Sequence, residues 1–215
     1  GAPASKAAKS RVVGSAAEAG RVLPPVPVSR MSASGVISYT VKGPLSGLTG
    51  AVFVQLPQGY TDAANASMRY PVIEAFHGYP GHAFDWTSSY LKLQQTSQKR
   101  TRPFLVVSPQ AEIPAGTDTE CVDGSPGYPQ LETWLAQDVP NWVTHTFRVR
   151  TDRTSWASIG LSAGGWCAAM VTMLHPAQYA AAIVISGYFR PEFGAFYEPY
   201  PPSSPLAARY DLVAL

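Results

Sequence analysis

The stretch SIGLSAGGWCAAM, residues 158–170, decides how the chain folds. Its residues 160–164 fit the pattern G-x-S-x-G, in which a serine stands on a sharp, strained turn between a strand and a helix. Small residues two positions before and after this serine let the strand and the helix approach each other closely. An apolar run precedes the turn and an alanine-rich run follows it, as the pattern requires. Ser162 is therefore the candidate nucleophile, and the alternative is a glycine-rich turn whose serine merely caps the helix.

Strands and helices alternate along the chain on both sides of this turn. Short apolar runs predict strands over residues 35–43, 50–60, 70–78, 103–110, 155–160 and 179–187. Helical spacing predicts helices over residues 85–98, 130–147 and 163–175, and Pro140 should bend the second of them. The first two strands should form an antiparallel hairpin, and the last strand should be buried. Alternation of this kind predicts an α/β fold with a mostly parallel sheet and helices on both faces.

The composition is that of one globular domain. The chain has 215 residues, of which 46% are hydrophobic and only 14% are charged. Residues 1–30 are predicted to be an N-terminal arm or linker, because they are rich in Ala and Ser and then in Pro, and residues 31–215 form the domain. A net charge of +2 without a dense basic run argues against nucleic acid as a partner. The low charge and the few lysines favour an exported, extracytoplasmic protein, with any membrane tether outside this segment.

A loop over residues 111–129 is long for a compact domain, and loops of this length often carry function. It contains Cys121, and the predicted helix after the turn contains Cys167. The two cysteines can form one disulfide in an oxidising compartment or stay as two separate thiols, and the sequence leaves both open. Cys167 is a poor alternative nucleophile, because a thiol in an apolar helix stays protonated. The four histidines lack metal-ligand spacing, so we expect no metal site and no cofactor.

A second turn, FHGYPG at residues 76–81, follows an earlier apolar strand. In enzymes that transfer acyl groups, an HG-type turn at this place supplies one backbone N–H of the oxyanion hole. The residue after the nucleophile supplies the other. This assigns the N–H groups of Tyr79 and Ala163, because Pro80 has no N–H. His77 is an alternative general base, but we expect its ring to hold the loop in place.

The segments LPQGY, HGYPG, LETWLAQDVPNWV and IGLSAGGWCAAM occur in a characteristic order and spacing. Over about residues 35–190 the chain thereby resembles the esterase D and mycolyltransferase branch of the α/β-hydrolases. The resemblance implies an α/β-hydrolase fold, a three-layer α/β/α sandwich, with a Ser–His–acid triad. By matching position it makes Ser162 the nucleophile and Tyr79 and Ala163 the oxyanion donors. The loop after the HG turn is shorter than in mycolyltransferases, which argues against acyl transfer to trehalose.

The sequence after Ser162 lacks the rest of such a triad. In this fold the order is Ser, then the acid, then His, and the only later histidine is His175, at the end of the next helix. The later acids follow no predicted strand; they are Glu192, Glu198 and Asp211. A helix should begin at about Asp211, and the chain stops within two turns of it. We therefore expect the N-terminal two-thirds of a hydrolase domain, incomplete at the C-terminus and inactive without a missing segment of the same domain.

These observations predict a serine carboxylic-ester hydrolase that acts on a small-molecule or lipid ester. An acyltransferase of the cell envelope would use the same acyl-enzyme, and a non-catalytic hydrolase-fold module would keep the turn without the triad. A group of aromatic residues near the carboxyl end either lines an acyl pocket or packs a Pro-rich cap on the sheet. Its members are Tyr188, Phe189, Phe193, Phe196, Tyr197 and Tyr200.

Overall fold

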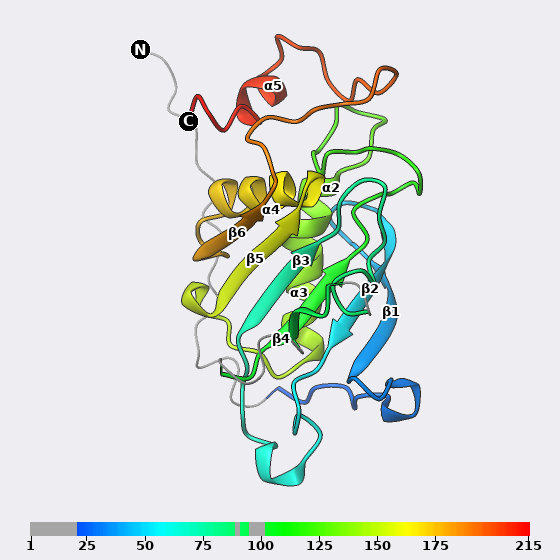
Figure 1. Ribbon diagram of the computed structural model, residues 1–215, viewed down its shortest axis with the longest axis vertical. Coiled ribbons are helices and arrows are strands. Elements are labelled where there is room, and N and C mark those ends of the chain that lie inside the picture. The colour runs from blue at the N-terminus through cyan, green and yellow to red at the C-terminus, as the bar shows by residue number, and fades with distance from the viewer. Residues whose placement is uncertain (1–20, 89–90, 95–101) are drawn as a thin grey trace.

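The computed structural model describes residues 21–88, 91–94 and 102–215, and its core is a sheet of six strands (Figure 1). The strands are β1 Val36–Lys42, β2 Thr49–Gln55, β3 Val72–Phe76, β4 Leu105–Pro109, β5 Trp156–Leu161 and β6 Ala181–Ile185. Their order across the sheet is β1-β2-β4-β3-β5-β6. Strands β4, β3, β5 and β6 are parallel, whereas β1 and β2 form an antiparallel hairpin and β2 runs antiparallel to β4. The predicted hairpin and the mostly parallel sheet are confirmed.

Two of the three predicted helices form as expected. The helical elements are α2 Leu131–Thr133, the π-helical turn η4 Trp134–Asp138, α3 Val139–Thr146, α4 Ala163–Leu174 and α5 Pro205–Arg209, with single 3-10 turns η2 Val28–Arg30, η3 Ala63–Asn65 and η5 Arg153–Ser155. Elements α2, η4 and α3 are continuous, so the helix predicted over 130–147 is one unit. Its wide π turn lies just before Pro140, which has no N–H to donate to the Ala136 carbonyl.

The main described helices pack on one face of the sheet. Successive strand residues point to opposite faces, so Val72 and Phe76 of β3 join the larger core with α3 and α4. Their neighbours Ile73 and Ala75 point to the other face, where a smaller cluster forms with Trp86. Of the helix predicted over residues 85–98, residues 85–88 form turns and residues 93–94 are helical, while residues 89–90 and 95–101 lie outside the described part.

Strand β6 corrects one expectation. The sequence predicts a buried strand, but the exposed fractions of Ile183 and Ile185 are 48% and 40%. Both side chains lie on the face of the smaller cluster, because Ile183 pairs with Ile159 in the register of β5 and β6. None of the described helices covers this face of the sheet at β6. An apolar run therefore predicts a strand here without predicting that it is buried.

The carboxyl-terminal segment corrects another expectation. The sequence predicts a helix from about Asp211, but α5 lies before that residue. Ser204 starts α5, because its side-chain oxygen accepts a hydrogen bond from the Ala207 N–H at 3.2 Å. Pro205 is the first helical residue, where its missing N–H is not needed. Asp211 instead forms an ion pair with Arg190 at 2.7 Å.

Part of the predicted N-terminal arm lies against the domain. Residues 1–20 lie outside the described part, and residues 21–27 are extended and lead into η2. Val26 packs against the larger core, and the Arg21 guanidinium donates to the Thr144 carbonyl at 3.4 Å. Within the described ranges, no helix is both long and apolar enough to cross a membrane.

Candidate active site

Ser162 stands at the junction of β5 and α4, as the sequence predicts (Figure 1). Its backbone has φ 57° and ψ −124°, a conformation that residues other than glycine rarely adopt. The Ser162 N–H donates to the Ile185 carbonyl at 2.9 Å, and its carbonyl accepts from the Gly165 N–H at 2.8 Å. Backbone hydrogen bonds on both sides therefore hold the strained turn, while the side chain is exposed. Strain that is maintained in this way is typical of functional sites.

The two glycines of the pattern are required by close packing. A Cβ on Gly160 would lie 1.8 Å from the Gly164 carbonyl oxygen, and a Cβ on Gly164 would lie 2.1 Å from the Phe76 carbonyl oxygen. Any side chain at either position would push α4 away from the sheet. The glycines thus bring the end of β3 against the start of α4, next to Ser162.

The HG turn that follows β3 borders the same serine. A Cβ on Gly78 would lie 3.6 Å from the Cβ of Ser162 and 3.1 Å from the Leu161 carbonyl oxygen. Tyr79 follows Gly78 directly, and Ala163 is the first residue of α4, where N–H groups have no acceptor within the helix. The structure therefore brings together the two segments that carry Tyr79 and Ala163. Their role as oxyanion donors stays a prediction.

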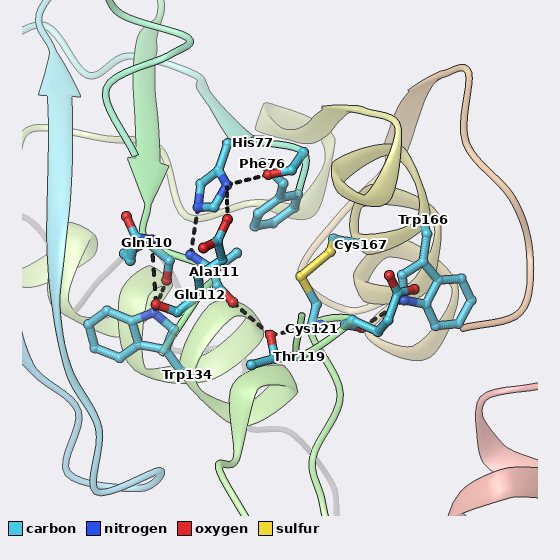
Figure 2. Close-up of a disulfide and its surroundings, with 12 residues drawn as sticks. Phe76, His77, Gln110, Ala111, Glu112, Thr119, Cys121, Trp134, Trp166 and Cys167 are labelled. Atoms are coloured by element: carbon cyan, nitrogen blue, oxygen red, sulfur yellow. Dashed lines mark hydrogen bonds and ion pairs between the residues drawn. A yellow bond between two sulfur atoms is a disulfide. The ribbon is translucent and has the colours of Figure 1, made fainter. Parts of the chain in front are cut away.

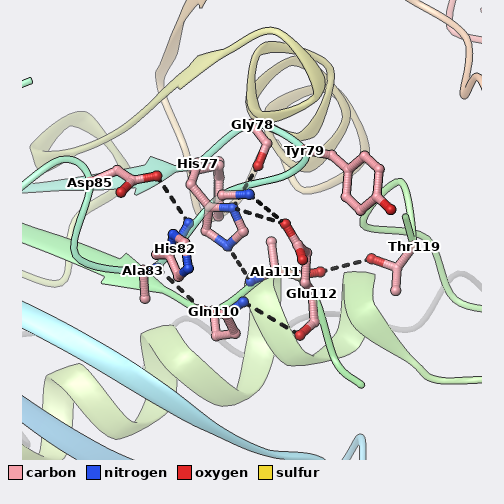
Figure 3. Close-up of polar contacts among 12 residues, drawn as sticks. His77, Gly78, Tyr79, His82, Ala83, Asp85, Gln110, Ala111, Glu112 and Thr119 are labelled. Carbon is pink, nitrogen blue, oxygen red and sulfur yellow. Dashed lines mark hydrogen bonds and ion pairs between the residues drawn. The ribbon is translucent and has the colours of Figure 1, made fainter. Parts of the chain in front are cut away.

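His77 holds this turn in place (Figure 3). The Ala111 N–H donates to Nε2 at 3.0 Å, so Nε2 carries no proton, and the Nδ1–H donates to the Gly78 carbonyl at 2.8 Å. Burial lowers the pKa of His77, which keeps the ring in this neutral form. Both ring nitrogens are occupied, so the ring is a structural link and no base for Ser162.

Glu112 ties the turn to the long loop after β4 (Figure 3). Its buried carboxylate accepts the Gly81 N–H at 2.7 Å and the Gly116 N–H at 3.2 Å. One carboxylate oxygen also lies 4.0 Å from Nδ1 of His77. The Tyr79 hydroxyl donates back to the Gly116 carbonyl at 3.3 Å. One acidic side chain thus fixes the turn that carries the Tyr79 N–H.

A disulfide fastens the same loop to the helix that starts at Ser162 (Figure 2). Cys121 and Cys167 are bonded to each other, which decides between the two alternatives that the sequence leaves open and removes Cys167 as a nucleophile. Next to this bond, the Trp166 indole N–H donates to the Glu120 carbonyl at 2.7 Å. The loop is therefore joined to α4 within two turns of the candidate nucleophile.

The side chain of Glu120 reaches the segment that follows β6. It accepts the Tyr188 O–H at 2.6 Å and the Glu192 N–H at 3.1 Å. Burial raises the pKa of Glu120 to about 8, although these hydrogen bonds act to lower it. The Tyr188 ring stacks on Trp166, with ring centroids 6.3 Å apart. Three segments of the chain therefore meet at Glu120.

The other histidines serve elsewhere, and all four histidines of the sequence lie within the described residues. His175 follows the twelve-residue helix α4, about 20 Å from Ser162 at the rise of an α-helix. Its Nε2 lies 2.6 Å from a Glu132 carboxylate oxygen. His145 bonds to a carbonyl of its own helix α3, and His82 is exposed on the loop after β3. No hydrogen bond joins any of these rings to Ser162 in the described part of the chain, so none is placed as its base.

Glu132 explains why His175 is needed where it is. Burial acts to raise the pKa of Glu132, but hydrogen bonds from His175, Arg209 and Tyr210 outweigh it and lower the pKa to about 2. This carboxylate links α2 to the end of α4 and to α5. His175 is therefore one of the residues through which Glu132 holds the carboxyl-terminal segment in place. None of the three later acids is hydrogen-bonded to a histidine in the described part of the chain: Asp211 pairs with Arg190, and Glu192 and Glu198 are exposed.

The aromatic residues near the carboxyl end pack mainly on one another. The Tyr200 ring is buried between Phe193 and Tyr210, with centroid distances of 5.4 Å and 5.6 Å. Tyr197 contacts Phe193 in turn, at 5.9 Å. A hollow of about 480 Å³ beside them is lined only by residues of the range 190–211. These contacts favour the packed cap over an acyl pocket at Ser162.

Sequence reasoning missed the buried carboxylates of the site. Glu112 and Glu120 both lie in the long loop, and its length is the only signal in the sequence that could have drawn attention to them. Their burial depends on contacts with segments that are distant in the sequence. Within the described part of the chain, no cluster of His, Cys, Asp and Glu could hold a metal ion.

One family and several known proteins match the chain. The model of the family described as "Putative esterase" matches residues 49–212. An uncharacterized protein of Corynebacterium glutamicum is 31% identical over 147 residues, which are 66% of this chain and 33% of that protein. The chain thus spans one third of the length of this relative.

Solved structures show the same fold. An S-formylglutathione hydrolase from Agrobacterium tumefaciens matches 85% of this chain and 71% of its own, with a TM-score of 0.68 and 14% identity. A ferulic acid esterase matches 83% of this chain and 66% of its own, with a TM-score of 0.63 and 21% identity. MPT51 of Mycobacterium tuberculosis matches 71% of this chain and 51% of its own, with a TM-score of 0.51 and 16% identity. At these identities the likeness shows the α/β-hydrolase fold, and the predicted fold class is confirmed.

Proposed function

The chain belongs to the family described as "Putative esterase", and from this premise we propose that it supplies the nucleophile and the oxyanion hole of a serine carboxylic-ester hydrolase. Ser162 Oγ attacks the ester carbonyl carbon and loses its proton to a base. The N–H groups of Tyr79 and Ala163 stabilise the negative charge that develops on the carbonyl oxygen. The bond to the alcohol then breaks, the alcohol takes the proton, and water hydrolyses the acyl-enzyme that remains.

The backbone of Ser162 is the observation that carries this proposal. A serine that only capped α4 would accept an N–H of the first helical turn with its side chain. Ser162 makes no such hydrogen bond, and its positive φ of 57° turns the side chain into an exposed position beside the HG turn. A strained, exposed serine between a strand and a helix is what nucleophilic attack requires.

The proton of Ser162 needs an acceptor, because a serine hydroxyl is a weak nucleophile without a base. None of the four histidines of this chain hydrogen-bonds Ser162, and three of them are engaged elsewhere. His77, His145 and His175 are therefore not available as the base. We expect the 215-residue chain by itself to react slowly with esters.

Fluorophosphonate labelling, followed by intact-mass measurement, tests the proposal. The full-length protein should take up one label and hydrolyse p-nitrophenyl acetate, and Ser162→Ala should lose the label and at least about a thousandfold in rate. Ser186→Ala is a matched control, because Ser186 is also exposed and has a positive φ of 49°. It should keep both signals.

Two outcomes would contradict the proposal. Labelling of the full-length protein that persists in Ser162→Ala would place the nucleophile elsewhere. A full-length protein without labelling or hydrolysis would favour a non-catalytic hydrolase-fold module. Rapid labelling of the 215-residue chain would show that a base exists among its own residues.

The disulfide supports the expectation that the protein acts outside the cytoplasm. Disulfides persist in oxidising compartments and are rare in the cytosol. The Cys121–Cys167 bond fixes the loop that borders the candidate nucleophile. The proposed esterase would therefore keep this geometry best in an extracytoplasmic setting.

A further inference from the structure

The parallel strands begin at the lower end of the sheet in Figure 1, and the segments at this edge are rich in arginine. Four segments meet there, namely the described arm and the stretches that lead into β3, β4 and β5. Together they carry seven arginines and two aspartates: Arg21, Arg30, Arg69, Arg102, Arg148, Arg150, Arg153, Asp62 and Asp152. The extent of this cluster is not apparent from the sequence, because the fold assembles it from separate segments.

The opposite edge, where β3, β4 and β6 end, has the reverse charge. Within residues 77–88, 110–130 and 186–215, eight acidic residues accompany two arginines: Asp85, Glu112, Asp118, Glu120, Asp123, Glu192, Glu198, Asp211, Arg190 and Arg209. The net charge of +2 therefore conceals two oppositely charged ends. Ser162 lies at the acidic end, because it follows β5 directly.

Two of the arginines at the basic edge bind carbonyl oxygens, whereas Arg150 forms an exposed ion pair with Asp152 at 3.1 Å. Arg148 donates to the Ala66 carbonyl at 2.9 Å, and its guanidinium lies 4.2 Å from the centre of the Tyr60 ring. Arg153 donates to the Pro176 carbonyl at 2.7 Å. Carbonyl oxygens satisfy the N–H groups of a guanidinium without cancelling its positive charge. These side chains thus present a fixed positive face to their surroundings.

Exposed apolar side chains lie among these arginines. Three arginines and one acid line a hollow of about 510 Å³ that Val28 also borders, namely Arg21, Arg69, Arg148 and Asp62. Val28 is 56% exposed, and Val22, beside Arg21, is 94% exposed. Met68, which directly precedes Arg69, is 43% exposed. Positive charge and exposed apolar groups therefore occur on the same face.

We propose that this basic face docks on a lipid surface rich in anionic headgroups. Arginines close to such a surface are attracted to it, and apolar side chains beside them can enter the headgroup region. The apolar groups favour a membrane over an anionic polymer, for which they would have no use. Docking in this way turns the acidic edge, with Ser162, away from the membrane. The inference does not depend on the chemistry of Ser162.

Co-sedimentation with vesicles tests the proposal. The protein should sediment with phosphatidylcholine vesicles that contain phosphatidylglycerol and not with phosphatidylcholine alone, and high salt should release it. The double variant Arg102→Gln/Arg153→Gln should lower the partition coefficient roughly 25-fold, from about fivefold for each arginine. The matched variant Lys42→Gln/Arg190→Gln removes two exposed charges at the opposite edge and should leave the partition coefficient unchanged.

Met68→Ser separates a membrane from an anionic polymer. It should weaken binding to the anionic vesicles and leave binding to heparin unchanged. Circular dichroism of each variant checks that the fold is retained. The proposal is overturned if vesicles without phosphatidylglycerol bind equally well, or if the two double variants behave alike. It is also overturned if heparin binds more tightly than the vesicles and Met68→Ser has no effect on either.

Discussion

The two edges of the sheet hold their loops with opposite kinds of side chain. At the edge where the parallel strands end, Glu112 accepts N–H groups from Gly81 and Gly116 and thereby joins two loops. At the edge where they begin, Arg148 donates to the Ala66 carbonyl and joins a loop before β3 to the approach to β5. A negatively charged acceptor thus joins loops at the edge where the parallel strands end, and a positively charged donor joins them at the edge where they begin. The side chains that join the loops therefore contribute to the opposite charges of the two edges.

The difference in burial decides what each edge can do. A carboxylate is short and must come close to the backbone that it binds, so Glu112 and Glu120 are buried. A guanidinium sits on a long stem and binds a carbonyl while staying near solvent, as the exposed Arg153 does. The edge around Ser162 is therefore held rigidly from within, whereas the other edge keeps its charge available for a partner. Buried groups should be sensitive to substitution and exposed ones tolerant.

The largest effect should come from Gly160→Ala. The new Cβ would lie 1.8 Å from the Gly164 carbonyl oxygen, and backbone cannot move away without separating α4 from β5. We expect the free energy of unfolding to fall by more than about 4 kcal/mol, with little folded protein recovered. Gly194→Ala is the control, because nothing lies within 4 Å of its Cβ position. Urea denaturation measures the stability of both variants, and equal stability would contradict close packing at the turn between β5 and α4.

The next largest effect should follow loss of the disulfide. Cys121 and Cys167 are separated by 46 residues, and closing a loop of that length stabilises a folded chain by about 4 kcal/mol in the chain-entropy model. Cys121→Ser/Cys167→Ser should therefore lose about 2–4 kcal/mol. Reduction of the unaltered protein should give the same loss, and a reductant should not affect the double variant further. A reductant effect on the variant would mean that the loss has another origin.

The turn at Ser162 could be predicted from the sequence because its geometry is local. The G-x-S-x-G spacing and the apolar runs beside it lie within about one strand and one helix of each other. The same holds for the hairpin of β1 and β2, whose alternation and turn are contiguous. Each of these features is determined by neighbours in the chain.

The rest depends on contacts between distant segments. The bond between Cys121 and Cys167 requires the loop after β4 to lie on α4, which neither segment reveals alone. The exposure of Ile183 depends on what covers that face of the sheet. Likewise, the charge separation arises only when parallel strands place segments from the whole chain at two edges. Sequence periodicity carries no information about such pairings.

Glu74 lies in the middle of the sheet, an environment that differs from both of its edges. It is buried in β3, with the Tyr179 hydroxyl 2.5 Å from its Oε2 and 3.4 Å from the Leu135 carbonyl. Burial raises the pKa of Glu74 from 4.5 to about 8. The folded state therefore holds this proton more tightly than the unfolded chain. The resulting stability is complete below about pH 4.5 and is lost as the pH rises through 8.

Between pH 5 and pH 8 this loss should amount to about 3 kcal/mol of the free energy of unfolding. Urea denaturation at a series of pH values measures it. Glu74→Gln has no proton to lose and should remove this part of the pH dependence, whereas the exposed Glu198→Gln should not. If Glu74→Gln kept the full slope, another group would be responsible, with Glu120 the first to examine because its pKa is also raised to about 8.

The smallest effects provide the most direct comparison of the two edges. In Glu112→Gln one acceptor oxygen becomes an NH₂ group, which would face the N–H of Gly81 or Gly116 without an acceptor between them. A buried donor left without a partner costs about 1–3 kcal/mol, and we expect a loss in that range. In Arg153→Gln the exposed side chain gives up a hydrogen bond that water can replace, so the loss should stay near 0.5 kcal/mol, about the limit for surface substitutions. Because both changes remove one charge and introduce the same amide, a difference between them reports the environment and not the chemistry of the substitution. Equal losses would mean that the edge around Ser162 is held no more rigidly than the other.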